Sequence, residues 1–114
     1  MGVSDDADVV RLRAIYKTIP NKVGTETVTT GGDQLDLSDW DGLDCRGRWV
    51  YVSCYGSDVT LLRGSTATTA GAGLVVIAGA PPIDLWIDES GDVDIYCIAH
   101  TANSSVSISL DDEP

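Results

Sequence analysis

The chain has 114 residues and a formal net charge of −11, which comes from 18 acidic and 7 basic residues. Hydrophobic residues make up 43% and charged residues 22%, as in a single folded domain and unlike a disordered chain. Nucleic-acid backbones and anionic lipids attract clusters of Lys and Arg, so this acidic charge argues against nucleic acid and against a membrane as partners. No apolar run reaches the length of about 18 residues that a transmembrane helix needs.

The first half of the chain alternates apolar and polar residues, a two-residue period that is typical of strands. After an N-terminal arm over 1–8 that we expect to be mobile, residues 10–17 predict a half-buried first strand, with a helix ending before Pro20 as the alternative. The β-branched stretch 24–30 predicts a short edge strand. A Gly-Gly-Asp turn and an irregular acidic loop over 38–44 follow.

The middle of the chain has a clear strand pattern. Residues 49–55 place aromatic side chains on one face and Val50, Val52 and Cys54 on the other. A short turn then leads into the apolar residues 59–63, which predicts that the two segments form a hairpin.

The remaining segments are short and separated by turn residues. The small, polar residues 64–73 predict a flexible loop, and the continuous apolar run 74–78 predicts a core strand. Alternation at 83–88, 93–100 and 106–110 predicts three further strands.

These elements together predict an all-β fold. We expect a single antiparallel β-sandwich of about eight short strands, jelly-roll-like or immunoglobulin-like, over residues 9–110, followed by an acidic tail over 111–114. The periodicity leaves a closed barrel as a further alternative.

Three cysteines, Cys45, Cys54 and Cys97, cannot all pair within one chain, and their spacing matches no metal or redox motif. We expect buried free thiols, which suit assembly in a reducing cytoplasm. The acidic start of the chain lacks the apolar run of a secretory signal, in agreement with that compartment. The only histidine, His100, lies an odd number of residues from Cys97, so the two are expected on opposite faces of a strand and not in a catalytic pair.

The acidic loop carries the candidate metal ligands Asp39, Asp41 and Asp44, because closely spaced carboxylates in a loop are able to bind calcium. The loop partly matches an EF-hand, but Leu37 stands at the first ligand position and Arg48 at the closing one. The alternative is a solvated turn in which the carboxylates cap backbone amides. We expect no metal and no cofactor. A small calcium-dependent enzyme is the least favoured of three functional hypotheses, and the other two are given below.

Catalytic patterns are sparse. A glycosidase needs two carboxylates at close range, and Asp84, Asp88, Asp92 and Asp94 flank Trp86 but fall on polar faces or in turns. The chain has neither a G-x-S-x-G nucleophile elbow nor a Walker A loop. We therefore expect that the protein is not an enzyme.

Trp86 is the first candidate for binding a partner. It alternates with Ile83, Leu85 and Ile87, which predicts that it faces outward, where a large aromatic side chain suggests a covered surface. Exposed Trp and Tyr residues also stack on sugars, so a carbohydrate-binding module or an adhesin is the alternative function.

The basic residues are unevenly distributed. Apart from three aspartates at positions 5, 6 and 8, the first 24 residues are locally basic, whereas the rest of the chain is acidic. The basic residues are Arg11, Arg13, Lys17 and Lys22. We expect this segment to bind an acidic surface of a partner or a neighbouring subunit, with a plain solvated edge strand as the alternative.

A succession of strand motifs runs from residue 34 to residue 110. It consists of Leu35-Asp36-Leu37, Gly47 to Val52, Ser57 to Leu62, Val75 to Gly79 and His100 to Ser109. The succession resembles small virion proteins of tailed bacteriophages, in which similar sequence motifs precede a Gly/Pro turn and a Ser-rich final strand. It contains no catalytic motif.

This resemblance implies a β-sandwich that decorates or cements a capsid as an oligomer, or that sits at the neck or tail. We therefore expect a virion structural protein, assembled in the host cytoplasm, that stabilises the shell as a capsid decoration protein. Its expected partners are the major capsid protein and further copies of itself, as a homo-oligomer and specifically a trimer.

Overall fold

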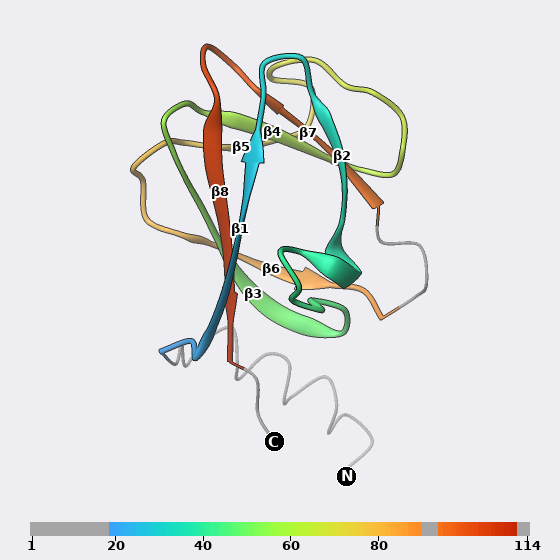
Figure 1. The fold of residues 1–114 in the computed structure, drawn as a ribbon, viewed down its shortest axis with the longest axis vertical. Helices are drawn as coiled ribbons and strands as arrows, with labels where there is room; N and C mark the ends of the chain where they lie inside the picture. Colours follow the sequence, from blue (N-terminus) through green and yellow to red (C-terminus); the bar gives the residue numbers. More distant parts are fainter. Residues whose placement is uncertain (1–18, 90–93, 112–114) are drawn as a thin grey trace, which may run out of the picture.

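The described strands form two four-stranded antiparallel sheets packed face to face (Figure 1). The computed structural model describes residues 19–89 and 94–111. In chain order the elements are β1 (Lys22–Val28), β2 (Asp33–Asp36), the 3-10 helix η1 (Leu37–Asp39), β3 (Arg48–Tyr55), β4 (Val59–Arg63), β5 (Leu74–Val76), β6 (Ile83–Ile87), β7 (Asp94–Ala99) and β8 (Ser104–Leu110). The predicted arm over 1–8, the predicted strand over 10–17 and residues 112–114 of the predicted tail lie outside the described residues. No helix in the described part is long and apolar enough to cross a membrane.

The strands are connected as in a jelly roll. The first sheet has the order β1-β8-β3-β6 and the second sheet has the order β2-β7-β4-β5. The pairs β1–β8, β2–β7, β3–β6 and β4–β5 show a chain that doubles back on itself at the β4–β5 loop. The pairs β3–β8 and β4–β7 then roll this ribbon into two sheets. The predicted antiparallel β-sandwich is confirmed, and its strand order is the jelly-roll one.

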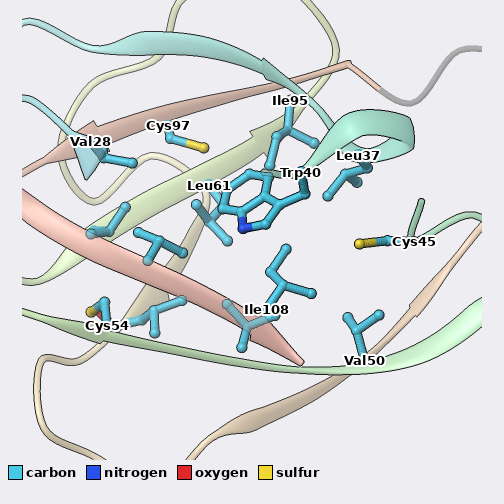
Figure 2. Packing of buried hydrophobic residues seen from close by; sticks show 14 of the residues in the cluster. Val28, Leu37, Trp40, Cys45, Val50, Cys54, Leu61, Ile95, Cys97 and Ile108 are labelled. Carbon is cyan, nitrogen blue, oxygen red and sulfur yellow. The ribbon is translucent and has the colours of Figure 1, made fainter. Parts of the chain in front are cut away.

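Alternation within the strands builds the core between the two sheets. Val50, Val52 and Cys54 of β3 are buried as predicted, while the residues between them point away from the core. Ile95 and Cys97 of β7 are buried in the same way in the second sheet. These side chains belong to one apolar cluster (Figure 2), so removal of apolar surface from water is the main force that holds the sheets together.

All three cysteines are buried free thiols, as predicted. Burial raises the pKa of Cys45 to about 11 and that of Cys97 to about 12, and it also raises the pKa of Cys54. The thiols are therefore protonated at neutral pH and behave as small apolar side chains. His100 lies on the other side of its sheet from Cys97, with Nε2 2.6 Å from Thr60 Oγ1, which agrees with the expectation of opposite faces.

The predicted hairpin of β3 with β4 is wrong. The two strands lie in different sheets, so the link Gly56–Asp58 crosses from one sheet to the other. Ser57 is buried, and its carbonyl oxygen accepts a hydrogen bond of 2.7 Å from the Ser104 hydroxyl. Asp58 Oδ1 accepts a hydrogen bond of 2.8 Å from the Ala78 amide. These bonds hold the crossover link against the start of β8 and against the segment between β5 and β6.

The predicted core strand over 74–78 is instead a short edge strand. β5 ends at Val76 and pairs only with β4. Val76 is buried, but Leu74 is 40% and Ile77 is 50% exposed. The continuous apolar run suggested burial on both faces, whereas a strand at the edge of a sandwich buries one face at most. The predicted edge strand over 24–30 is confirmed as β1.

The acidic loop after β2 covers the free edge of β1. We call residues 37–45 the Trp40 loop, because Trp40 is fully buried and lies at the centre of the apolar cluster (Figure 2). Its indole Nε1 donates a hydrogen bond of 3.2 Å to the carbonyl oxygen of Gly24. The Thr25 amide donates one of 3.1 Å to Asp41 Oδ2. The loop thus satisfies backbone groups of an edge strand that would otherwise be open to pairing.

Candidate functional site

The outward positions of the first sheet carry a group of aromatic residues, of which two are exposed and two are half-buried. We call this group the aromatic face; it consists of Trp49, Tyr51, Tyr55 and Trp86. Trp86 lies opposite Trp49 in the β3–β6 register, and the ring centroids are 5.8 Å apart at an interplanar angle of 60°. Tyr55 is 66% and Trp86 is 45% exposed. The prediction that Trp86 faces outward is therefore confirmed.

Serine and threonine side chains continue the same face across β8 and β1. Ser105, Ser107 and Ser109 alternate with buried residues of β8, and Thr25 Oγ1 lies 3.1 Å from Ser107 Oγ. Within the described strands of the first sheet, Asp84 is the one charged residue at an outward position. A chain with a net charge of −11 thus presents one sheet face with almost no charge, and depletion of charge is typical of the centre of protein interfaces.

The structure describes Lys22 alone among the four basic residues predicted to bind a partner; Arg11, Arg13 and Lys17 lie outside the described residues. Lys22 is exposed at the start of β1. Two strands separate β1 from β6 in the first sheet. At a spacing of roughly 4.8 Å per strand, Lys22 and Trp86 are about 14 Å apart across the sheet. The structure therefore does not bring these two predicted residues into one cluster.

The predicted calcium ligands are each engaged by a different group. Asp39 Oδ1 accepts a hydrogen bond of 3.1 Å from the backbone amide of Gly42. Asp41 Oδ2 accepts one from the backbone amide of Thr25 in β1. Asp44 accepts two hydrogen bonds from the Arg46 guanidinium, at 3.0 and 2.9 Å. Those bonds are the main reason that the pKa of Asp44 falls to about 2. Over the ranges 19–89 and 94–111, no group of three or more His, Cys, Asp or Glu side chains is arranged to hold a metal ion.

The carboxylates that flank Trp86 also have separate surroundings. Asp88 Oδ2 lies 3.5 Å from the guanidinium of Arg63. Asp94 Oδ2 accepts a hydrogen bond of 3.4 Å from the side-chain Nε2 of Gln34. Asp92 lies outside the described residues. The two carboxylates are thus tied to different strands of the second sheet, β4 and β2.

A cavity of about 510 Å³ lies between the two sheets. Its lining residues come from both sheets and are mostly aliphatic: Leu37, Val52, Leu61, Leu62, Arg63, Leu74, Leu85, Trp86, Ile87, Asp88, Ile95 and Ile108. The strands that contribute them include β5 and β6, the edge strands of the two sheets. The cavity is therefore at the β5–β6 side of the sandwich, and Leu37, the first residue of the Trp40 loop, also lines it.

Sequence reasoning missed most of these surface features. The alternation in residues 49–55 already places Trp49, Tyr51 and Tyr55 on one face, but the contact of Trp49 with Trp86 depends on the pairing of β3 with β6. The cavity depends on how the two sheets pack, for which a single sequence carries no local signal.

Comparison of the chain with protein-family models, with curated proteins and with solved structures finds no match.

Proposed function

We propose that this chain is a structural protein of a bacteriophage particle, namely a capsid decoration protein that binds and stabilises the shell of major capsid protein. The observation that carries the proposal is the aromatic face, an exposed and nearly uncharged surface on an otherwise acidic molecule. Large exposed apolar groups on a rigid sheet are typical of surfaces that a protein partner covers.

Two further points support the proposal. The succession of strand motifs between residues 34 and 110 resembles small virion proteins of tailed bacteriophages. The jelly roll is also an architecture of viral capsid domains, which is an analogy at the level of the fold and is shared with other functions.

In the proposed complex the aromatic face is covered by the shell and Trp86 is the main anchor. The basic residues Arg11, Arg13, Lys17 and Lys22 add attraction to acidic groups of the shell or of a neighbouring copy. The protein acts as a homo-oligomer, specifically a trimer. Because several copies then bind the shell together, the overall affinity exceeds that of a single copy. It is located in the virion after assembly in the host cytoplasm.

The experiment is reconstitution on phage particles prepared without this protein. The wild-type chain is expected to bind in a saturable manner and to raise the temperature at which the particles release DNA. Trp86→Ala is expected to weaken binding by about 2 kcal/mol, or roughly thirtyfold, as truncation of an interface anchor does. Ile77→Ala is the matched control, because Ile77 is also half exposed but lies after β5 in the other sheet; its affinity should stay within about twofold of the wild type.

Absence of saturable binding by the wild-type chain would refute the decoration function. Equal binding by the Trp86→Ala and Ile77→Ala variants would refute the assignment of the aromatic face as the docking surface. Sedimentation of the free protein and of protein released from particles tests the expected trimer.

The Trp49–Trp86 pair specifically favours one second candidate, a carbohydrate-binding module or adhesin. The tilted indole rings beside a row of hydroxyl groups resemble the surfaces on which sugars stack. This function predicts a shift of tryptophan fluorescence on one member of a glycan panel, abolished by Trp86→Ala. A silent panel together with binding to particles excludes the sugar and favours the shell.

A further inference from the structure

The cavity at the β5–β6 side is open to solvent, because exposed residues such as Leu74 and Trp86 line it together with buried ones. At about 510 Å³ it is within the range of small-molecule sites, roughly 300–1,000 Å³. It is not part of the aromatic face, with which it shares only Trp86.

The inner wall of the cavity is apolar. Val52 and Ile108 of the first sheet and Leu61 and Ile95 of the second are buried residues of the main core. A space lined by such side chains offers water no hydrogen-bond partners and instead accepts apolar guests. The chemistry of the wall therefore selects an uncharged, apolar occupant.

The charged lining residues lie at the mouth. The side chains of Arg63 and Asp88 are 67% and 55% exposed, and they form an ion pair of 3.5 Å between β4 and the end of β6. This pair joins the two sheets at the entrance. A β-strand of a partner protein would enter only after the ion pair had broken and the two sheets had moved apart. A small molecule needs less room, and an exposed ion pair is weak enough to open and close.

We propose that this cavity is a binding site for an uncharged apolar small molecule, of the size of a compound with two or three aromatic rings or of a medium-length aliphatic chain. The guest lies between the sheets against the buried aliphatic wall, beneath the Arg63–Asp88 pair. The site shares Trp86 with the aromatic face, but its other lining residues lie outside that face, so either proposal is able to fail without the other.

The test is titration of the full chain with N-phenyl-1-naphthylamine, an uncharged dye that brightens in apolar surroundings. The expected result is saturable binding of one dye per chain, with a melting temperature that rises with dye concentration because the dye stabilises only the folded state. The dye is excited directly, so the tryptophan residues of the chain do not contribute to the signal.

Two single variants with the same charge change locate the site. Leu74 lines the cavity and is 40% exposed, whereas Ile77 is 50% exposed and does not line it. Leu74→Glu places a carboxylate at the mouth and is expected to weaken dye binding at least tenfold. Ile77→Glu is the matched control and should stay within about twofold of the wild type. Leu85→Trp, which occupies part of the cavity, is a second variant in case Leu74→Glu does not melt cooperatively.

Three results would overturn the proposal. The first is no saturable binding to the cooperatively folded wild-type chain. The second is equal dye affinity in the wild type and in whichever of the two cavity variants is folded. The third is a stoichiometry of one dye per two or three chains, which would place the dye between copies of the protein.

Discussion

At the scale of single residues, the acidic loop shows how carboxylates at calcium-like spacing serve the backbone. Asp36 Oδ1 accepts hydrogen bonds from both the amide and the hydroxyl of Ser38, at 2.8 and 2.7 Å. These bonds lower the pKa of Asp36. Asp39 caps a nearby amide in the same way. The alternative of a turn with capping carboxylates is thus the one that the geometry supports.

The Asp44–Arg46 pair yields a pH prediction. Hydrogen bonds from Arg46 lower the pKa of Asp44 from 3.8 to about 2. Since the folded-state pKa is depressed, the stability that this pair contributes is fully present above about pH 4 and is lost as the pH falls through about 2. The pair is about half exposed, so the contribution is expected to stay below about 1 kcal/mol.

NMR titration of the Asp44 carboxyl carbon checks this prediction, with an expected midpoint near 2. Arg46→Ala should return the midpoint towards the ordinary value. Arg63→Ala removes an arginine elsewhere in the fold and should leave the midpoint where it is. A midpoint near the ordinary value in the wild type would show that the pair does not persist in solution.

Trp40 is the residue whose role the sequence concealed most. It stands between two aspartates in a loop with no apolar period, yet its side chain is fully buried. Because the chain contains no Phe, Trp and Tyr are the only aromatic residues available for the core, but composition does not tell which of them is buried. That choice depends on the Trp40 loop folding back onto β1, a contact between segments far apart in sequence.

At the scale of elements, the sequence predicted the strands well and their partners poorly. Alternation is a local property, and it placed β3, β4, β6, β7 and β8 close to their observed bounds. Pairing is decided by contacts between distant segments. The short link between β3 and β4 resembled a hairpin turn, but β3 buries its apolar face by pairing with β6 and β8. Among the described strands, only β4 and β5 are neighbours both in sequence and in a sheet.

The contact between the Trp40 loop and β1 yields a stability prediction. A Cβ atom added at Gly24 would lie 2.4 Å from the carbonyl oxygen of Trp40, closer than atoms can approach. Gly24→Ala is therefore expected to lift the loop and to lower the free energy of unfolding by ~2 kcal/mol, as overpacking does. Urea denaturation measures the change.

Gly31→Ala is the matched control for this substitution. A Cβ at Gly31 would have its nearest neighbour at 3.8 Å, an ordinary contact, so this variant should be neutral or slightly more stable. Equal stability of the two variants would contradict the packing of the Trp40 loop on β1.

At the scale of the whole molecule, composition indicated the acidity of the chain but not where the charge is missing. The outward positions of β1, β8, β3 and β6 become one surface only when the fold joins segments from both ends of the chain. The cavity is a property of two sheets together and has no counterpart in any stretch of sequence. The outward orientation of Trp86 could be predicted from the sequence, because Trp86 alternates with the apolar residues of its own strand.

The three buried thiols report on the integrity of the entire fold. Because burial raises the pKa of each thiol, the native chain is expected to react with iodoacetamide at pH 8 roughly a thousandfold more slowly than the unfolded chain. Mass spectrometry should find all three cysteines alkylated in denaturant. Ile77→Cys, at an exposed site, should add one fast-reacting thiol to the native protein. Fast labelling of any of the original cysteines would contradict their burial.

The adjacency of β1 and β8 has a practical consequence for engineering. Lys22 lies beside Leu110 in the register of these strands, so the first and the last described strand have their outer ends at the same pole of the sandwich. A circularly permuted chain, with those ends tethered and new ones opened in the loop 64–73, would keep every strand pair. It would turn the pairing with the greatest sequence separation into a local one, and such a reduction in contact order favours faster folding. Cargo attached at the new ends would then project from the opposite region of the molecule.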